Sequence, residues 1–511
     1  MADPVHEHDK QVLHKLGYAQ ELARRMSGFS NFAISFSIIC VLAGGISSFP
    51  AAFNSTGGGG VFVGWLLGGL FALLVSLSMG QIASAYPTAG GLYHWGSILG
   101  GKFCGWVTAW FNLLGLVFVV SSVDVYLYLV FFKGLLLETV LHVDTSGLTM
   151  LHQHLFVAVC LVTQALLNHF GIKLTTALTD LSGYLIFTLT VILIVALFVY
   201  SPVTPDFSRL VTFTNYTGAA GGGVIPKHTS SLFLGFFFGL IYVMYTITGF
   251  DASGHTSEET HDAQVNVPKG MWTAVFYSWI LGLVMVAAFV LAMPNLDQAA
   301  GAGFDSFFYM WSAVAERMPK ALEILLAVGL VTVNYICALA GLTSTSRMMY
   351  AFARDGGLPA SGFLSHVSVS TRAPTYAIWT AIALAFLATL YADAFLILAT
   401  GCAVFLYISY IIPVLAGFFA EGRSWKEKGP FRLGIWSRPV AILAATGVAL
   451  LATTGFFPPN QRVFYLTVAM AIVLPILWFA GVRKRFEGVP VGERIQARQK
   501  MIAEIEKKYG P

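Results

Sequence analysis

The chain has 511 residues, of which 57% are hydrophobic and 11% are charged, and its mean hydropathy is +0.74. Soluble domains carry roughly a quarter charged residues, so this composition excludes a soluble globular protein and indicates an integral membrane protein. The formal net charge of +4 is too small to suggest a nucleic-acid partner.

The N-terminal sequence MADPVHEHDKQVLHK is polar and lacks an early apolar stretch, so no cleavable signal peptide is expected. All the cysteines fall in apolar runs and none forms a CxxC pair, so neither a zinc site nor a disulfide framework is predicted. No metal and no cofactor are expected. These cysteines are Cys40, Cys104, Cys160, Cys337 and Cys402.

Segments of about 20 apolar residues are long enough to cross the hydrocarbon layer as helices. On that basis we predict an all-α integral membrane protein with twelve transmembrane helices. The predicted spans are 29–53, 61–85, 103–132, 154–170, 177–200, 231–256, 270–293, 321–352, 374–391, 394–420, 438–457 and 463–481. Polar or Gly/Pro-rich joints separate them, the longest being 201–229.

The basic residues predict the orientation of these spans. If both termini are cytoplasmic, only six of the 29 Lys and Arg residues lie outside, namely Lys133, Arg209, Lys227, Arg317, Lys320 and Arg462. We therefore predict a cytoplasmic segment 1–28, a transporter domain 29–482 and a basic cytoplasmic tail 483–511. Within the tail, 491–509 has apolar residues at helical spacing, and it would either lie on the anionic inner leaflet or be solvated.

Two of the spans contain residues that weaken a helix. The first has Gly44-Gly45 followed by two serines and Pro50, and the sixth has Gly249, Asp251 and Gly254 in its second half. Irregular backbone at membrane depth is tolerated where it lines a cavity. Paired interruptions at equivalent positions of two halves point to the binding site of an inverted-repeat transporter.

The helix dipoles at these breaks predict the ligand. The outer half of the first helix would begin near Ile46 with unpaired N–H groups, which suit a carboxylate. The first half of the sixth helix would end near Tyr245–Thr248 with unpaired carbonyls, which suit an ammonium group. A zwitterion satisfies both ends.

Three motifs resemble the signature segments of the amino acid–polyamine–organocation transporter superfamily: YPTAGGLYHWG (86–96), TGFDASGHTSEET (248–260) and STSRMMYAFARDGGLP (344–359). The second motif is most similar to the branch of amino acid, choline and GABA permeases. The resemblance covers about residues 20–480. It implies a LeuT-type fold with inverted repeats at about 29–200 and 231–420, discontinuous helices one and six, and two extra helices at about 438–481.

The resemblance also implies a substrate site, by position in these motifs. Ala43, Gly44, Gly45 and Ile46 match the carboxylate-binding segment of helix one. The amine-binding segment of helix six matches Tyr245, Thr246, Ile247, Thr248 and Gly249, with Tyr245 also at the position of an aromatic gate. Where some relatives have a lysine in helix five, this chain has a hydrophobic residue near Ile186. Cys337 and Gly341 stand where sodium-coupled relatives have hydroxyl groups. The sequence therefore predicts neither a clear proton relay nor a clear sodium site.

Several acidic residues have more than one interpretation. Asp251 would attract the substrate amine, cap the inner half of helix six, or take a coupling proton. Glu258 and Glu259 would form an inner gate with Arg347 or Arg24/Arg25, or be solvated interface charges. Asp124 is expected near the outer surface, as a residue that steers cations or an interfacial one.

An aromatic cluster and a histidine cluster also have two interpretations each. Tyr242, Tyr245 and Phe250 would form a cation–π box or simply pack. His142, His152 and His154 in an outer loop would bind a metal or be solvated.

The preferred function is a secondary active transporter of an amino acid or GABA-like ω-amino acid, working by alternating access and coupled to a proton or operating by exchange. The alternative is a transporter of an organic cation such as choline or a polyamine. No HExxH motif and no matched Ser/His/Asp set occur, so an enzyme is not expected. The predicted location is the cell (plasma or inner) membrane, and the last two spans offer a surface for a homodimer.

Overall fold

The computed structural model describes residues 4–218, 224–225, 228–391, 395–456 and 460–509. Within these residues the regular secondary structure is helical, apart from the two isolated β-bridges Met26–Thr260 and Glu421–Trp425. Parts of the predicted ranges lie outside the described residues, namely 1–3 and 510–511 of the two tails, Lys227, and positions 394 and 457 at the ends of two spans.

The first half of the chain forms helices at all five predicted spans. The elements are α1 (Pro4–Lys15), α2 (Gly28–Ile39), α3 (Val41–Ala85), α4 (Leu92–Gly100), α5 (Lys102–Tyr126), η1 (Leu127–Val140), α6 (Met150–His169), α7 (Ile172–Val199) and η2 (Phe207–Leu210). α3 is two helices joined by a turn, because Thr56 and Gly57 leave helical geometry with φ of −142° and +70°.

The second half repeats this use of long helices. Its elements are α8 (Leu232–Thr246), α9 (Ala252–His255), η3 (Ser257–Glu259), α10 (Ala263–Ala292), α11 (Leu296–Gly301), η4 (Gly303–Asp305), α12 (Ser306–Ala315), α13 (Lys320–Arg354), α14 (Ser361–Leu364), α15 (Thr375–Tyr391), α16 (Phe395–Ala420), η5 (Gly434–Trp436), α17 (Ser437–Gly455), α18 (Gln461–Leu477), η6 (Trp478–Val482), α19 (Arg483–Arg485) and α20 (Glu493–Lys507).

Length and composition make many of these helices suitable for a membrane. Among the described residues, nine helical segments are long and apolar enough to cross one, and two shorter apolar helices are Leu232–Thr246 and Thr375–Leu390. Every predicted span overlaps a helix. The helices support an all-helical membrane protein, while the count of twelve crossings and the inverted-repeat arrangement stay predictions.

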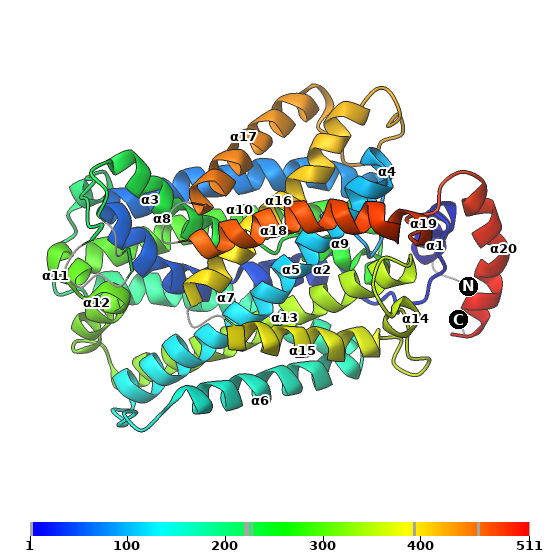
Figure 1. Ribbon diagram of the computed structural model, residues 1–511. Helices are drawn as coiled ribbons and strands as arrows, with labels where there is room; N and C mark the ends of the chain where they lie inside the picture. The colour runs from blue at the N-terminus through cyan, green and yellow to red at the C-terminus, as the bar shows by residue number, and fades with distance from the viewer. Residues whose placement is uncertain (1–3, 219–223, 226–227, 392–394, 457–459, 510–511) are drawn as a thin grey trace.

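The long helices lie side by side around a buried centre (Figure 1). α8 and α10 pack against α3, and α13 and α16 pack against α5, which is the most buried of the long apolar segments. α6 and α18 lie at the periphery, where Leu155, Val159 and Ile472 are more than half exposed. Exposed apolar side chains on the flanks of a helical bundle match contact with lipid.

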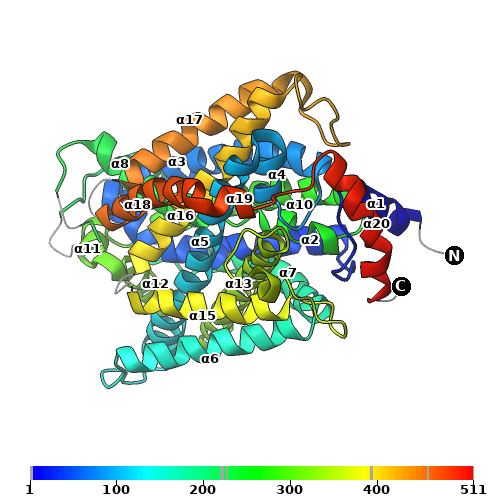
Figure 2. The ribbon, with the colours of Figure 1, turned by 45° about the vertical axis from the view of Figure 1, so that its right-hand side comes forward.

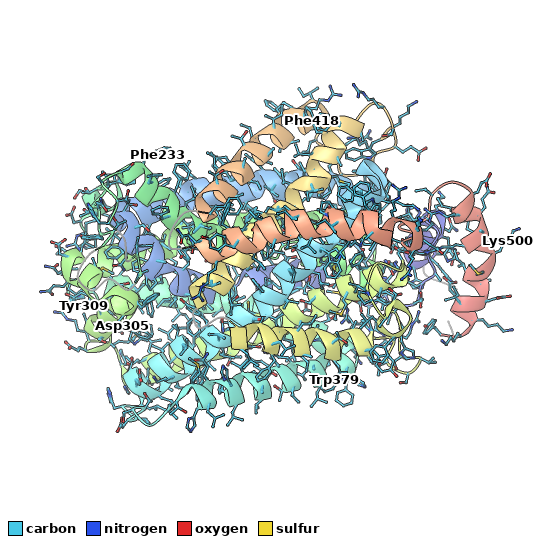
Figure 3. The ribbon with its side chains drawn as sticks, viewed as in Figure 1. Phe233, Asp305, Tyr309, Trp379, Phe418 and Lys500 are labelled. Carbon is cyan, nitrogen blue, oxygen red and sulfur yellow. The ribbon has the colours of Figure 1, made fainter. Side chains whose placement is uncertain are left out.

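The two ends of the bundle differ. α11 and α12 lie at one end, whereas α1 and α20, the first and last helices, lie at the other, which we name the terminal face (Figures 1 and 2). Figure 3 shows Phe233, Asp305 and Tyr309 at the first end and Lys500 of α20 at the terminal face. The tail does not stand apart, because Ile502 of α20 is buried against the protein.

Candidate functional site

The first predicted break lies at Cys40, between α2 and α3. Cys40 has φ 38° and ψ 60°, and its N–H closes α2 on the Phe36 carbonyl. The expected start near Ile46 is therefore wrong: Gly44 N–H already donates to the Cys40 carbonyl at 2.8 Å, so Gly44 and Gly45 lie inside α3. The N–H groups without a partner in the helix are those of its first turn, at Val41–Ala43.

The second break lies between α8 and α9, at residues 247–251, close to its expected position. Gly249 has φ +81°, and a Cβ there would stand 2.1 Å from Cγ2 of Ile38, so only glycine fits. Two tyrosines of α16 hold the open backbone. Tyr407 Oη donates to the Ile247 carbonyl at 2.7 Å, and Gly249 N–H donates to Tyr410 Oη at 3.0 Å.

The two breaks face each other. Thr246 Oγ1 at the end of α8 lies 3.0 Å from the Gly44 carbonyl and 2.9 Å from Ser48 Oγ, both in α3. A Cβ on Gly44 would meet Cγ2 of Thr246 at 2.8 Å. The glycine therefore allows the close approach of α3 to α8 rather than unwinding the helix.

A cavity lies between the breaks. Water-sized molecules can occupy only about 20 Å³ of it, so this conformation is closed and has room for about one water. Its lining comes from α2, α3, α5, α8 and α13 and from the two breaks, with these residues: Ile38, Ile39, Cys40, Gly44, Ser47, Val119, Val123, Tyr126, Tyr245, Thr246, Thr248, Asn334 and Cys337.

Four of the predicted substrate residues line this cavity, namely Gly44, Tyr245, Thr246 and Thr248. Ala43, Gly45, Ile46, Ile247, Gly249 and Asp251 are not among its lining residues. Gly45 faces the opposite way, since its Cβ would meet Cε of Met285 at 2.3 Å. Tyr245 Oη is hydrogen-bonded to Ser122 Oγ of α5 at 2.9 Å, which fixes the ring across the cavity.

Most of the lining from α5 and α13 was not predicted, apart from Cys337, which was named at the position of a sodium-binding hydroxyl. Tyr126 Oη donates to the Ser47 carbonyl at 2.9 Å, and Asn334 Nδ2 donates to the Val123 carbonyl at 3.0 Å. These residues lie in regular apolar helices. No local pattern marks them, because they become site residues only through packing against the breaks.

Asp251 begins α9, but its side chain makes no cap hydrogen bond there. It is fully buried and accepts from Asn112 Nδ2 at 2.9 Å and Tyr410 Oη at 2.8 Å, with His255 Nε2 at 3.2 Å. Asp251 therefore neither caps the helix through its side chain nor lines the cavity where it could attract the substrate amine. His255 was not singled out by the sequence.

The predicted gate residues form two buried ion pairs toward the terminal face. Glu259 meets Arg347 through two contacts of 3.0 and 3.1 Å, and both side chains are fully buried. Glu258 pairs with Arg354, a partner that the sequence did not suggest, at 2.8 and 3.0 Å. The solvated interpretation is therefore wrong. Burial alone raises the pKa of Glu258, but Arg354 and the Ala89 N–H lower it overall.

Asp355, directly after α13, joins several segments at the terminal face. Its carboxylate accepts from Tyr18 at 2.7 Å, Tyr93 at 3.0 Å and Arg498 of α20 at 3.0 Å, and it lies 3.1 Å from His94 Nε2. Burial by itself raises the pKa of this carboxyl, but His94 and the neighbouring arginines lower it to about 2. Asp355 is therefore an ionised anchor that the sequence did not predict.

Packing corrects one further expectation and decides between the two interpretations of another. Asp124 is fully buried and accepts from Gln164 Nε2 of α6 at 2.9 Å, instead of lying at the outer surface. Of the proposed aromatic box only Tyr245 reaches the cavity, since Phe250 packs against Tyr410 with ring centres 4.8 Å apart. Of the outer-loop histidines, His142 and His152 are exposed, and His152 Nδ1 contacts Thr149 at the start of α6.

Known proteins resemble the chain over nearly its whole length. The family described as Amino acid permease matches residues 26–480. "Amino-acid permease BAT1" of Arabidopsis thaliana is 32% identical, covering 95% of this chain and 97% of the relative. Its homolog in Oryza sativa subsp. japonica is 31% identical, covering 93% of this chain and 94% of the relative. The "GABA-specific permease" of Saccharomyces cerevisiae is 27% identical, covering 89% of this chain and 79% of the relative.

Proposed function

This chain belongs to the amino acid permease family, a family of transporters rather than enzymes, and we propose that it is a secondary active transporter of an amino acid or GABA-like ω-amino acid. The observation that carries the proposal is the pair of facing helix breaks at one cavity. The similarity to a GABA-specific permease supports the ω-amino acid as a substrate class.

The polarity of the breaks supports a zwitterionic substrate. α3 begins at Val41 with N–H groups that have no partner within the helix, and this end carries a partial positive charge. α8 ends at Thr246 with the opposite partial charge. A carboxylate at the first end and an ammonium at the second would use both, whereas a choline-like cation would leave the first end without an anionic partner.

The closed state of the cavity supports alternating access. A substrate larger than water requires the breaks to separate, and release toward the terminal face requires the Glu258–Arg354 and Glu259–Arg347 pairs to move apart. Tyr245 would close the cavity on its other side. We propose these residues as the gates.

The proposed arrangement in the membrane has twelve crossings, with the LeuT-type repeats at about 29–200 and 231–420 and two extra helices at 438–481. The terminal face with segments 1–28 and 483–511 would be cytoplasmic in the plasma or inner membrane. Transport would be coupled to a proton or run by exchange. The outer surface of the last two spans would accommodate a homodimer.

Uptake into proteoliposomes tests the substrate. We expect saturable uptake of labelled alanine or GABA, measured with pH and sodium gradients varied separately. Saturable uptake of choline or putrescine without uptake of either amino acid would overturn the proposal.

The Gly44→Ala variant tests the site. Its methyl group would enter the closed cavity and press on Thr246, so we expect KM to rise by about tenfold, which is a loss of ~1.4 kcal/mol. Gly64→Ala is the matched control, because a Cβ at Gly64 in the same element has ordinary contacts at 3.8 Å. Equal KM values in the two variants would remove Gly44 from the site.

A further inference from the structure

Asp251 and His255 form a fully buried pair one helical turn apart, at the start of the inner half of the sixth helix. Nε2 of His255 lies 3.2 Å from Oδ2 of Asp251. Nδ1 of His255 lies 3.1 Å from the carbonyl oxygen of Ala89, in the loop between α3 and α4. Neither residue lines the cavity, so the pair is separate from the substrate site described above.

The donors and acceptors of this pair determine how many protons it holds. A backbone carbonyl only accepts, so Nδ1 of His255 carries a hydrogen. The Nε2 to Oδ2 contact then needs a second proton, because an unprotonated Nε2 and a carboxylate oxygen would face each other as two acceptors. A neutral histidine beside an ionised aspartate satisfies only one of the two contacts.

We propose that the Asp251–His255 pair is the site that binds the proton coupled to transport. This inference rests on the proposed function and deepens it by naming the coupling ion and its ligands. The proton lies on Nε2, as an imidazolium with a carboxylate, or on Oδ2, as a carboxylic acid with a neutral ring. In both forms the pair holds one exchangeable proton in addition to the one on Nδ1.

The neighbours of the pair support this assignment. From α5, Asn112 Nδ2 donates to Oδ2 of Asp251 at 2.9 Å. From α16, Tyr410 donates to Oδ1 at 2.8 Å, and the Cys402 thiol is a further titratable group on the same helix near Asp251. Within the described part of the chain, no lysine or arginine is hydrogen-bonded or ion-paired to the pair, so the proton is the cation that balances the Asp251 charge.

The same contacts connect the proton to both halves of the transport cycle. Tyr410 joins Asp251 to the Gly249 N–H in the helix break. Ala89, which His255 contacts through its carbonyl, also donates its N–H to Oε1 of Glu258 at 3.0 Å. Loss of the proton breaks either the contact to Asp251 or the contact to Ala89. Deprotonation thus loosens the helix break or the loop that holds the Glu258–Arg354 pair.

Transport assays with the full chain in proteoliposomes test the inference. The His255→Gln variant should retain exchange of labelled substrate between equal concentrations to within about threefold, but lose accumulation driven by an imposed pH gradient. The matched control is His8→Gln, an exposed histidine of α1. Asp124→Asn is the second control, because Asp124 is a fully buried carboxylate in α5, which lines the cavity.

Gradient-driven accumulation by His255→Gln at the wild-type level would overturn the inference, and so would its loss in Asp124→Asn alone. Failure of the wild-type protein to transport any of the amino acids would instead overturn the proposed function. The two failures are therefore distinguishable.

A spectroscopic measurement on the wild-type protein covers the case in which His255→Gln does not fold. The signals of the pair are identified by difference from whichever of His255→Gln or Asp251→Asn is folded. Two protonated ring nitrogens by ¹⁵N NMR, or a neutral ring together with the infrared band of a protonated carboxyl, support the inference. A neutral ring without that band overturns it.

Discussion

Single residues at the two helix breaks show how little backbone freedom the site allows. Gly249 combines a φ of +81° with a Cβ position 2.1 Å from Ile38, so both conformation and space exclude a side chain. Cys40 adopts positive φ without being glycine. Strained backbone of this kind persists where surrounding contacts over-determine it, as at ligand sites.

Gly249→Ala is expected to destabilise the protein by ~1–3 kcal/mol from backbone strain, before the clash with Ile38 adds to it. The midpoint of thermal unfolding in detergent measures this loss. Gly64→Ala, where the added methyl has room, should leave the midpoint unchanged. A Gly249→Ala protein as stable as Gly64→Ala would show that the break relaxes freely.

The environment of Asp355 predicts that the protein loses stability at the terminal face as the pH falls. Burial opposes ionisation, but His94 and the arginines lower the pKa of Asp355 from 3.8 to about 2. The unfolded chain binds this proton at higher pH than the folded one, so the stabilisation is complete above about pH 4 and is lost as the pH falls toward 2. The free energy involved is ~2 kcal/mol.

Thermal unfolding between pH 5 and pH 2 checks this prediction. The wild-type protein should lose more stability over that range than Asp355→Asn, which has no carboxyl to protonate. Parallel curves for the two proteins would contradict the assignment.

At the scale of elements, the short segment α9–η3 is held on all sides by long helices. η3 supplies Glu258 and Glu259 to two arginines of α13, and α9 supplies His255 to the loop that precedes α4. Breaking a buried ion pair leaves one charge without compensation, which costs more than removing both partners. The two ion pairs therefore position the segment, and opening of the proposed gate would have to separate both of them.

A double-mutant cycle on Glu259 and Arg347 measures this coupling. Glu259→Gln and Arg347→Met should each cost ~3–5 kcal/mol of stability, while the double variant should cost less than their sum. Lys320→Met is the control, because Lys320 is about half exposed in its pair with Glu323 and should contribute at most ~1 kcal/mol. Additive losses in the cycle would mean that the two groups do not stabilise each other.

At the scale of the whole molecule, the two ends of the chain close the terminal face together. Glu506 of α20 pairs with Lys10 of α1 at 2.7 Å and accepts from the Gln20 N–H at 2.9 Å. Asp9 of α1 accepts from the N–H groups of Asp262 and Ala263, where α10 begins. The tail thus packs on the N-terminal segment, a contact that neither the lipid-bound nor the solvated interpretation included.

Glu506→Gln is expected to release this contact. Limited trypsin digestion should cleave the N-terminal segment faster in Glu506→Gln than in the wild-type protein, because the variant loses the charge that holds Lys10. Glu504→Gln, on the exposed side of the same helix, is the control. Equal digestion rates would show that α20 does not hold the segment.

The sequence by itself determined the class of protein, the positions of the apolar helices and the place of the second break. These features depend on local chemistry: apolar length sets a helix, and Gly249 permits a backbone that other residues resist. The sequence also offered Arg347 as one of the possible partners of Glu259, because charges inside apolar surroundings need partners.

Only the tertiary structure decided where the first helix breaks and what the buried polar groups contact. Gly44 and Gly45 looked like the break but serve close helix packing, while Cys40 carries the irregular backbone. Asp251 meets Asn112, Tyr410 and His255, and His255 meets Ala89. Most of these partners lie more than a hundred positions apart in the chain, so the proton that the pair must hold follows from packing and not from any local pattern.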